Sequence, residues 1–131
     1  MDVSEFIEVL EQSDKPDHRF VFISMDREIS GVVLSLEWRE DVLWVEYKDS
    51  RNYMYDRAFD RGDPPAYSTR EVIEALRGHE GPLDIRYVNT CFGGTITKAW
   101  WHELGYLYIS DDGVPEPRRD FPVVVPEASN G

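Results

Sequence analysis

The chain opens with apolar residues spaced as on one face of a helix: Val3, Phe6, Ile7 and Leu10. This i, i+3, i+4, i+7 spacing predicts an amphipathic helix. Asp2 stands at the expected N-cap position, and Glu5, three residues later, completes a capping box. Pro16 follows the pattern and cannot continue a helix, so we expect the element to end before it.

A second amphipathic helix is predicted from residue 69 onward. Ser68 and Glu71 form another capping box at its start. Its apolar stripe then consists of Val72, Ile73 and Leu76. Gly78 stands where a helix commonly ends, because glycine adopts the left-handed backbone conformation of a C-cap.

Between these helices, apolar and polar residues alternate in two runs, 32–38 and 43–47. Alternation with period two predicts β-strands, and the short gap predicts an antiparallel hairpin. Hydrophobic matching selects the register, because a slip of one residue exchanges the two faces of a strand. A four-residue loop, 39–42, makes one face wholly apolar by pairing Trp38 with Leu43, Leu36 with Val45 and Leu34 with Tyr47.

A second hairpin is predicted near the C-terminus, where 95–101 pairs with 106–110 across the loop 102–105. In this register one face carries Ile96, Trp100, Leu107 and Ile109. The other face carries Thr95, Thr97, Trp101, Tyr106 and Tyr108. A short helix over 98–104 is the alternative, but β-branched and aromatic residues favour the strand.

These elements predict an α+β fold with a single antiparallel sheet of about five to seven strands packed against two amphipathic helices. The remaining strands are expected in the apolar run 19–25 and the alternating run 83–88, with further candidates at 51–56 and 123–125. The length of 131 residues is that of one domain, which we place at 1–126 with a flexible tail at 127–131.

The charge of the chain limits its partners. It has 26 acidic residues against 14 Lys and Arg, a formal net charge of −12. This argues against direct binding to nucleic acid or to an anionic membrane. Neither a membrane span nor a signal peptide is apparent, and a single cysteine forms no internal disulfide, so a cytoplasmic location is expected.

The sequence contains weak candidates for chemistry. Cys91 and His102 could pair as nucleophile and base, with Gly93 and Gly94 as oxyanion donors. A buried, inert cysteine followed by a glycine turn is the better interpretation. The histidines lack metal-ligand spacing and no cofactor motif is present, so we assign no catalytic residue, metal or cofactor.

Aromatic side chains on the sheet are the better candidates for a binding surface, because Trp and Tyr are common interface anchors. The predicted anchors are Trp44, Trp101, Tyr106 and Tyr108. Acidic residues near them would steer a basic partner, and these are Glu37, Glu46, Asp111 and Asp112. The same aromatic face could instead be covered by another copy of the chain in a homo-oligomer.

The leading hypothesis is therefore an acidic, non-enzymatic protein that blocks or sequesters a basic protein, such as a nucleic-acid-binding protein. Inhibitors, immunity proteins, viral anti-defence proteins and nucleic-acid mimics have this general physical character. One alternative is a small-molecule-binding protein or small enzyme with a pocket near residues 91–97. Another is an acidic domain whose charge reflects adaptation to high salt.

Overall fold

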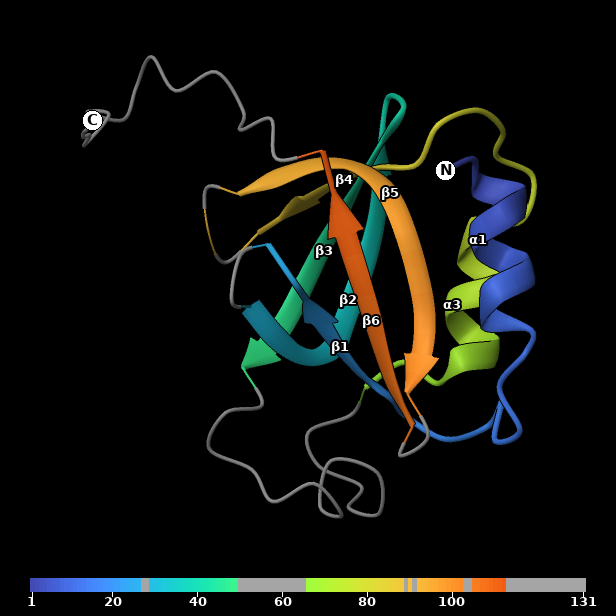
Figure 1. Ribbon diagram of the computed structural model, residues 1–131. Coiled ribbons are helices and arrows are strands. Elements are labelled where there is room, and N and C mark those ends of the chain that lie inside the picture. Colours follow the sequence, from blue (N-terminus) through green and yellow to red (C-terminus); the bar gives the residue numbers. More distant parts are fainter. Residues whose placement is uncertain (27–28, 50–65, 89, 91, 103–104, 113–131) are drawn as a thin grey trace.

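The structure is a computed structural model that describes residues 1–26, 29–49, 66–88, 90, 92–102 and 105–112 (Figure 1). Two helices and six strands occur within these residues. In chain order they are α1 (Val3–Leu10), β1 (Val21–Ser24), β2 (Ile29–Arg39), β3 (Val42–Asp49), α3 (Thr69–Leu76), β4 (Asp84–Tyr87), β5 (Gly93–His102) and β6 (Tyr106–Asp111). The α+β class and the order of these elements agree with the sequence prediction.

The six strands form one sheet that closes into a barrel in the order β1-β2-β3-β4-β5-β6. Neighbours are antiparallel at β1–β2, β2–β3, β4–β5 and β5–β6. They are parallel at β3–β4 and β1–β6, so the prediction of a wholly antiparallel sheet was wrong at two junctions. Parallel neighbours need a long crossover. The chain between β3 and β4 contains α3, and β1 and β6 are the first and last strands.

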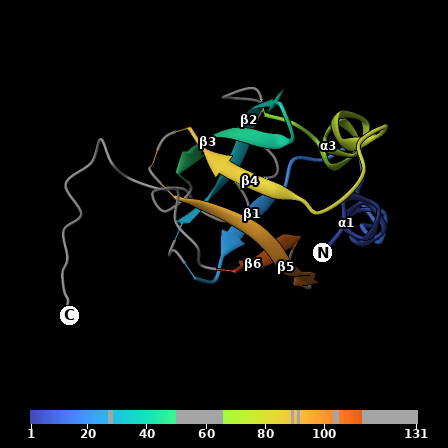
Figure 2. The same ribbon diagram turned by 90° about the horizontal axis from the view of Figure 1, so that it is seen from above.

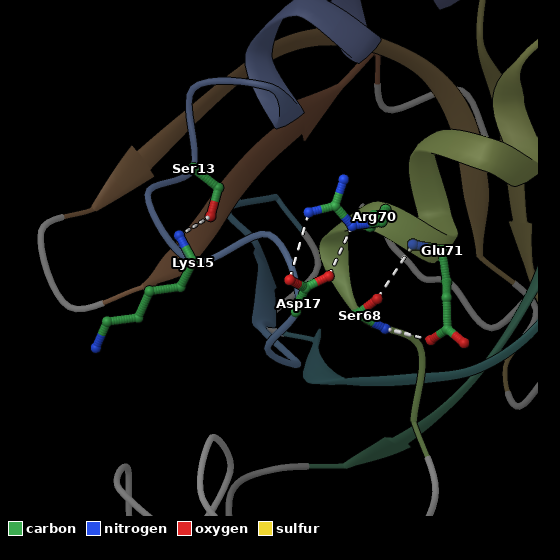
Figure 3. Close-up of polar contacts among 6 residues, drawn as sticks. All are labelled: Ser13, Lys15, Asp17, Ser68, Arg70 and Glu71. Carbon is green, nitrogen blue, oxygen red and sulfur yellow. Dashed lines mark hydrogen bonds and ion pairs between the residues drawn. The ribbon is translucent and has the colours of Figure 1, made fainter.

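The two helices lie side by side on one side of the barrel, as both views show (Figures 1 and 2). Their buried residues complete the main core: Val3, Phe6 and Leu10 from α1, and Val72, Ile73 and Leu76 from α3. At the start of α3 the amide of Glu71 donates to Ser68 Oγ at 3.1 Å, and Glu71 Oε1 accepts from the amide of Ser68 at 2.7 Å (Figure 3). The predicted capping of α3 is therefore confirmed.

Each helix is attached to the barrel by the indole N–H of a tryptophan. Trp38 in β2 donates to the carbonyl of Ala75 in α3 at 2.9 Å. Trp101 in β5 donates to the carbonyl of Val9 in α1 at 2.6 Å. Both carbonyls lie in the last turn of their helix, where helical hydrogen-bond partners become fewer; that of Val9 also accepts from the amide of Gln12 at 3.1 Å. The two indoles therefore satisfy helix ends as well as filling space.

Aromatic rings fill the middle of the barrel. Phe22 stacks on Tyr87 with ring centroids 5.7 Å apart, and Tyr47 meets both rings edge-on. Closer to the helices an apolar cavity of about 40 Å³ remains, lined by side chains that include Phe6, Leu76 and Leu107. Ligand pockets usually measure roughly 300–1,000 Å³. The cavity is thus a small packing defect of the core.

The first hairpin has the predicted register over most of its length. Leu36 pairs with Val45 and Trp38 with Leu43. The ladder continues one pair further, to Arg39 and Val42, so the loop has two residues and not four. Glu40 in this turn has a positive φ of 59°. That conformation is one a two-residue hairpin turn requires, and the sequence lacks the glycine or asparagine that usually signals it.

A β-bulge corrects the prediction at the other end of this hairpin. The register shifts between Val33 and Ser35, so Tyr47 pairs with Val33 and not with Leu34. Val33 enters the main core, whereas Leu34 packs on the outside of the barrel. A bulge inserts one extra residue and reverses the alternation beyond it. The predicted pair of Leu34 with Tyr47 was therefore wrong.

The second hairpin is a hairpin, and the alternative of a helix over 98–104 is excluded because β5 continues to His102. Its predicted register was wrong by one residue. His102 pairs with Tyr106 and Trp101 with Leu107, which leaves three residues in the loop. A second bulge, between Ile96 and Lys98, changes the alternation again. The predicted faces of Trp100 and Trp101 are consequently exchanged.

Several predicted features lie outside the described residues. These are the candidate strands at 51–56 and 123–125, Cys91, and the tail at 127–131. Among the helices that the structure describes, none is long and apolar enough to cross a membrane.

Candidate protein-binding surface

Trp44 occupies the outer surface of the barrel, as predicted. Alternation along β3 directs Leu43 and Val45 into the core and Trp44 away from it. Glu37 lies directly opposite Trp44 on β2, and Glu46 lies opposite Ser35 on the same outer face. The Ser35 hydroxyl donates to Glu46 Oε1 at 3.0 Å. Three of the predicted site residues are thus brought together, with Trp44 partly buried and both carboxylates exposed.

Trp101 and Tyr106 do not lie on an accessible aromatic face, so this part of the prediction was wrong. Trp101 packs against the main core, with its ring 5.6 Å from Phe20, and its N–H is bonded to α1. Tyr106 is 5% exposed and belongs to a smaller apolar cluster on the outside of β1 and β2, with Val21 and Val32. The bulge between Ile96 and Lys98 explains the position of Trp101, because it reverses the faces of β5 beyond it. Tyr106 keeps its predicted outer face, but it is buried there by the small apolar cluster.

The two predicted aspartates also differ in their surroundings. Asp111 is 9% exposed, and its amide donates to Asp26 Oδ2 at 2.9 Å. Its side chain is therefore poorly placed to steer a partner. Asp112 is exposed, but its Oδ1 accepts from the amide of Thr95 at 3.2 Å, where it supports the start of β5.

The exchange of faces exposes an aromatic group that the sequence analysis missed. Trp100, 40% exposed, lies with its ring centroid 5.7 Å from that of Tyr108. The ring of His102 also stacks on Tyr108, with ring centroids 5.6 Å apart. Tyr108 lies on the predicted outer face, but Trp100 lies beside it in place of the predicted Trp101. The position of the bulge alone determines which of the two adjacent tryptophans faces outward, and no residue in the sequence clearly predicts that position.

The side chain of Arg39 completes the surface around Trp44. Its guanidinium carbon lies 4.7 Å from the centre of the indole, within the range of a cation–π contact. The same guanidinium donates to Glu37 Oε1 at 3.0 Å. The indole of Trp44 and the carboxylate of Glu37 therefore both contact the guanidinium of Arg39. Trp44 was predicted beside Glu37, whereas Arg39 was expected in a four-residue loop and lies instead in the ladder opposite Val42.

The charge around this group is negative. Residues 37–46, which we name the acidic hairpin end, contain Glu37, Glu40, Asp41 and Glu46 against the single cation of Arg39. All four acids are exposed. Arg86 is the neighbour of Trp44 on β4, but it pairs with Asp84 at 3.2 Å and its side chain is only 17% exposed. The exposed end of the hairpin therefore favours a cation over an anion.

Among the residues suspected of catalysis, Cys91 lies outside the described residues, and the glycine pair lies at the opposite end of β5 from His102. Gly93 and Gly94 begin β5 opposite Arg86 and Ile85, so they are ladder residues and not a free glycine turn. His102 ends the same strand, roughly 25–30 Å away at the rise of a β-strand. Within the described part of the chain, no three His, Cys, Asp or Glu side chains are grouped as a metal site.

One further ion pair is structural. Arg70 Nε lies 2.6 Å from Asp17 Oδ1 and joins the start of α3 to the segment that follows α1 (Figure 3). The hydrogen bond from Arg70, and then its charge, lower the pKa of Asp17 below its ordinary value. Both side chains are well exposed, so this pair is screened by solvent.

No family, curated protein or solved structure matches this chain.

Proposed function

We propose that this protein is an acidic, non-enzymatic binding protein that blocks or sequesters a basic protein in the cytoplasm, as inhibitors, immunity proteins and viral anti-defence proteins do. The acidic hairpin end is the contact surface. The observation that carries the proposal is the guanidinium of Arg39 held by Trp44 and Glu37, which shows that this surface accommodates a basic side chain.

Two physical effects support binding here. The partly buried indole of Trp44 supplies a rigid apolar anchor of the kind that dominates interface energies. The exposed carboxylates of Glu37, Glu40, Asp41 and Glu46 attract a positive partner over the range of a Debye length, about 8 Å at physiological salt. Such attraction mainly accelerates association and selects for the sign of the partner's charge.

The exposed aromatic group of Trp100, Tyr108 and His102 provides a second, separate contact area. It lies on β5 and β6 and could extend the interface with the partner or pair with another copy of the chain. The alternative is a small-molecule-binding protein with a pocket near residues 91–97, which include the undescribed Cys91; the core cavity of about 40 Å³ is too small to be that pocket.

Charge reversal tests the proposal. Glu37→Lys combined with Glu46→Lys changes the charge of the acidic hairpin end, whereas Glu8→Lys combined with Glu80→Lys makes the same total change at other exposed positions. Wild-type protein and both double variants are immobilised, exposed to host proteins and eluted with a salt gradient.

We expect a basic protein that the wild type and the Glu8/Glu80 variant capture and the Glu37/Glu46 variant loses. Purified partner should then bind the wild type with an affinity that falls as salt rises. Equal capture by both double variants, or binding indifferent to ionic strength, would contradict the proposal.

A further inference from the structure

We infer that Trp44 and Glu37 form a recognition site for an arginine side chain of the partner, and that Arg39 occupies this site until the partner displaces it. The inference deepens the proposed function and rests on it for its biological meaning. It goes further in naming the recognised group, a planar guanidinium, and in assigning Arg39 the role of an internal competitor.

The geometry of the hairpin explains why such a site exists. Glu37 and Trp44 are directly paired across β2 and β3, which places carboxylate and indole side by side on one face. Arg39 is two residues beyond Glu37 on the same face, and its side chain turns back over both. The site is therefore built from two strands, while its present occupant comes from the end of one of them.

Arg39 is an exchangeable occupant. Its side chain is 52% exposed and that of Glu37 is 62% exposed, so the contact between them is open to solvent. Exposed ion pairs and cation–π contacts are weak, because solvent and side-chain entropy compete with them. An incoming arginine would make the same contacts and would also bring the buried area of the rest of an interface.

The chemistry of the site favours arginine over lysine. A guanidinium is flat and weakly hydrated, so it stacks on an indole while its N–H groups bond a carboxylate in the same plane. An ammonium group is compact and strongly hydrated, and it satisfies both contacts less well. A site of this construction therefore discriminates between two side chains of equal charge, which a merely acidic surface does not.

The test uses labelled, capped hexa-arginine and hexa-lysine peptides, titrated separately into the full-length protein. The readout is the ratio of the two affinities, since a change in total charge shifts both peptides alike. Arg39→Ala empties the site, and Arg77→Ala removes an exposed positive charge from the end of α3 as the matched control. Trp44→Leu removes the aromatic platform, and Phe92→Leu removes an exposed aromatic side chain that lies outside both contact areas.

We expect the wild type to prefer hexa-arginine by about two- to fivefold, the range of an exposed cation–π contact. Arg39→Ala should raise this ratio, Arg77→Ala and Phe92→Leu should leave it unchanged, and Trp44→Leu should abolish it. Circular dichroism verifies the fold of each variant. If Trp44→Leu does not fold, Arg39→Ala against Arg77→Ala decides the question alone.

A ratio near one in both the wild type and Arg39→Ala overturns the inference, and so does an arginine preference that survives Trp44→Leu. The peptides do not involve the natural partner. Failure of this test would thus leave charge-dependent capture of a basic protein standing, and failure to capture a partner would leave a positive peptide result standing.

Discussion

Replacing Trp101 with phenylalanine separates the roles of two adjacent tryptophans in β5. The substitution keeps an aromatic ring beside Phe20 but removes the N–H that donates to the carbonyl of Val9 at 2.6 Å. The carbonyl of Val9 keeps its bond from the amide of Gln12 at 3.1 Å, so loss of the indole bond should cost about 0.5–1.5 kcal/mol. The smaller ring adds a packing loss, because a core side chain that shrinks leaves empty volume.

The matched substitution is Trp100→Phe. Trp100 is 40% exposed on the opposite face of the same strand, where surface substitutions usually change stability by about 0.5 kcal/mol or less. Urea unfolding followed by circular dichroism gives the free energy of unfolding of both variants. Equal dependence of this free energy on urea concentration shows that the variants expose similar surface areas when they unfold. Hydrogen exchange adds a local readout, since amides of α1 should lose protection in Trp101→Phe alone. Equal destabilisation by the two substitutions would refute the assignment of faces.

Other substitutions and conditions test the remaining parts of the structure. Gly31→Ala should destabilise by about 1–3 kcal/mol in urea unfolding, because a Cβ there would lie 2.4 Å from the carbonyl oxygen of Lys48. Leu76→Ala should cost about 2–5 kcal/mol in the same assay, since this fully buried side chain lines the core cavity. Asp17→Asn should lower stability slightly at neutral pH, where the lowered pKa of Asp17 keeps it ionised beside Arg70; this difference should vanish as pH falls below about 4 through that pKa, and also in high salt. Finally, the wild type should remain folded when transferred to low salt, as thermal melts would show; unfolding there would favour the alternative of a salt-adapted domain.

Local patterns were sufficient to predict both helices and the first hairpin. The stripe of α1 and the capping box of Ser68 and Glu71 depend on residues three or four positions apart, so they are visible in the sequence. The pairing of Trp38 with Leu43 also followed from matching apolar faces. These successes placed Trp44 correctly on the outside, beside Glu37.

The β-bulges and the closure of the sheet into a barrel could not be predicted from local sequence patterns. The register shift near Thr97 and the shorter loop reversed the faces of Trp100 and Trp101. Because the two residues are identical, the alternation of apolar and polar residues does not indicate which of them faces the core. The parallel contacts of β3 with β4 and β1 with β6 depend on strands far apart in the chain. The position of Arg39 over Trp44 could have been suspected only after the turn was known to be short.

Trp38, in β2, offers a way to detect binding at a distance from the contact surface. Glu37 and Arg39 face outward to the proposed partner, while Trp38 between them faces inward, bonds the carbonyl of Ala75 and stacks under His79 at 3.8 Å. A partner that displaces the backbone of β2 around Trp38 would therefore also move the Trp38 side chain, which lies on the opposite side of the strand. The exchange rates of α3 amides and the resonances of the His79 ring should therefore register an encounter that touches neither of them.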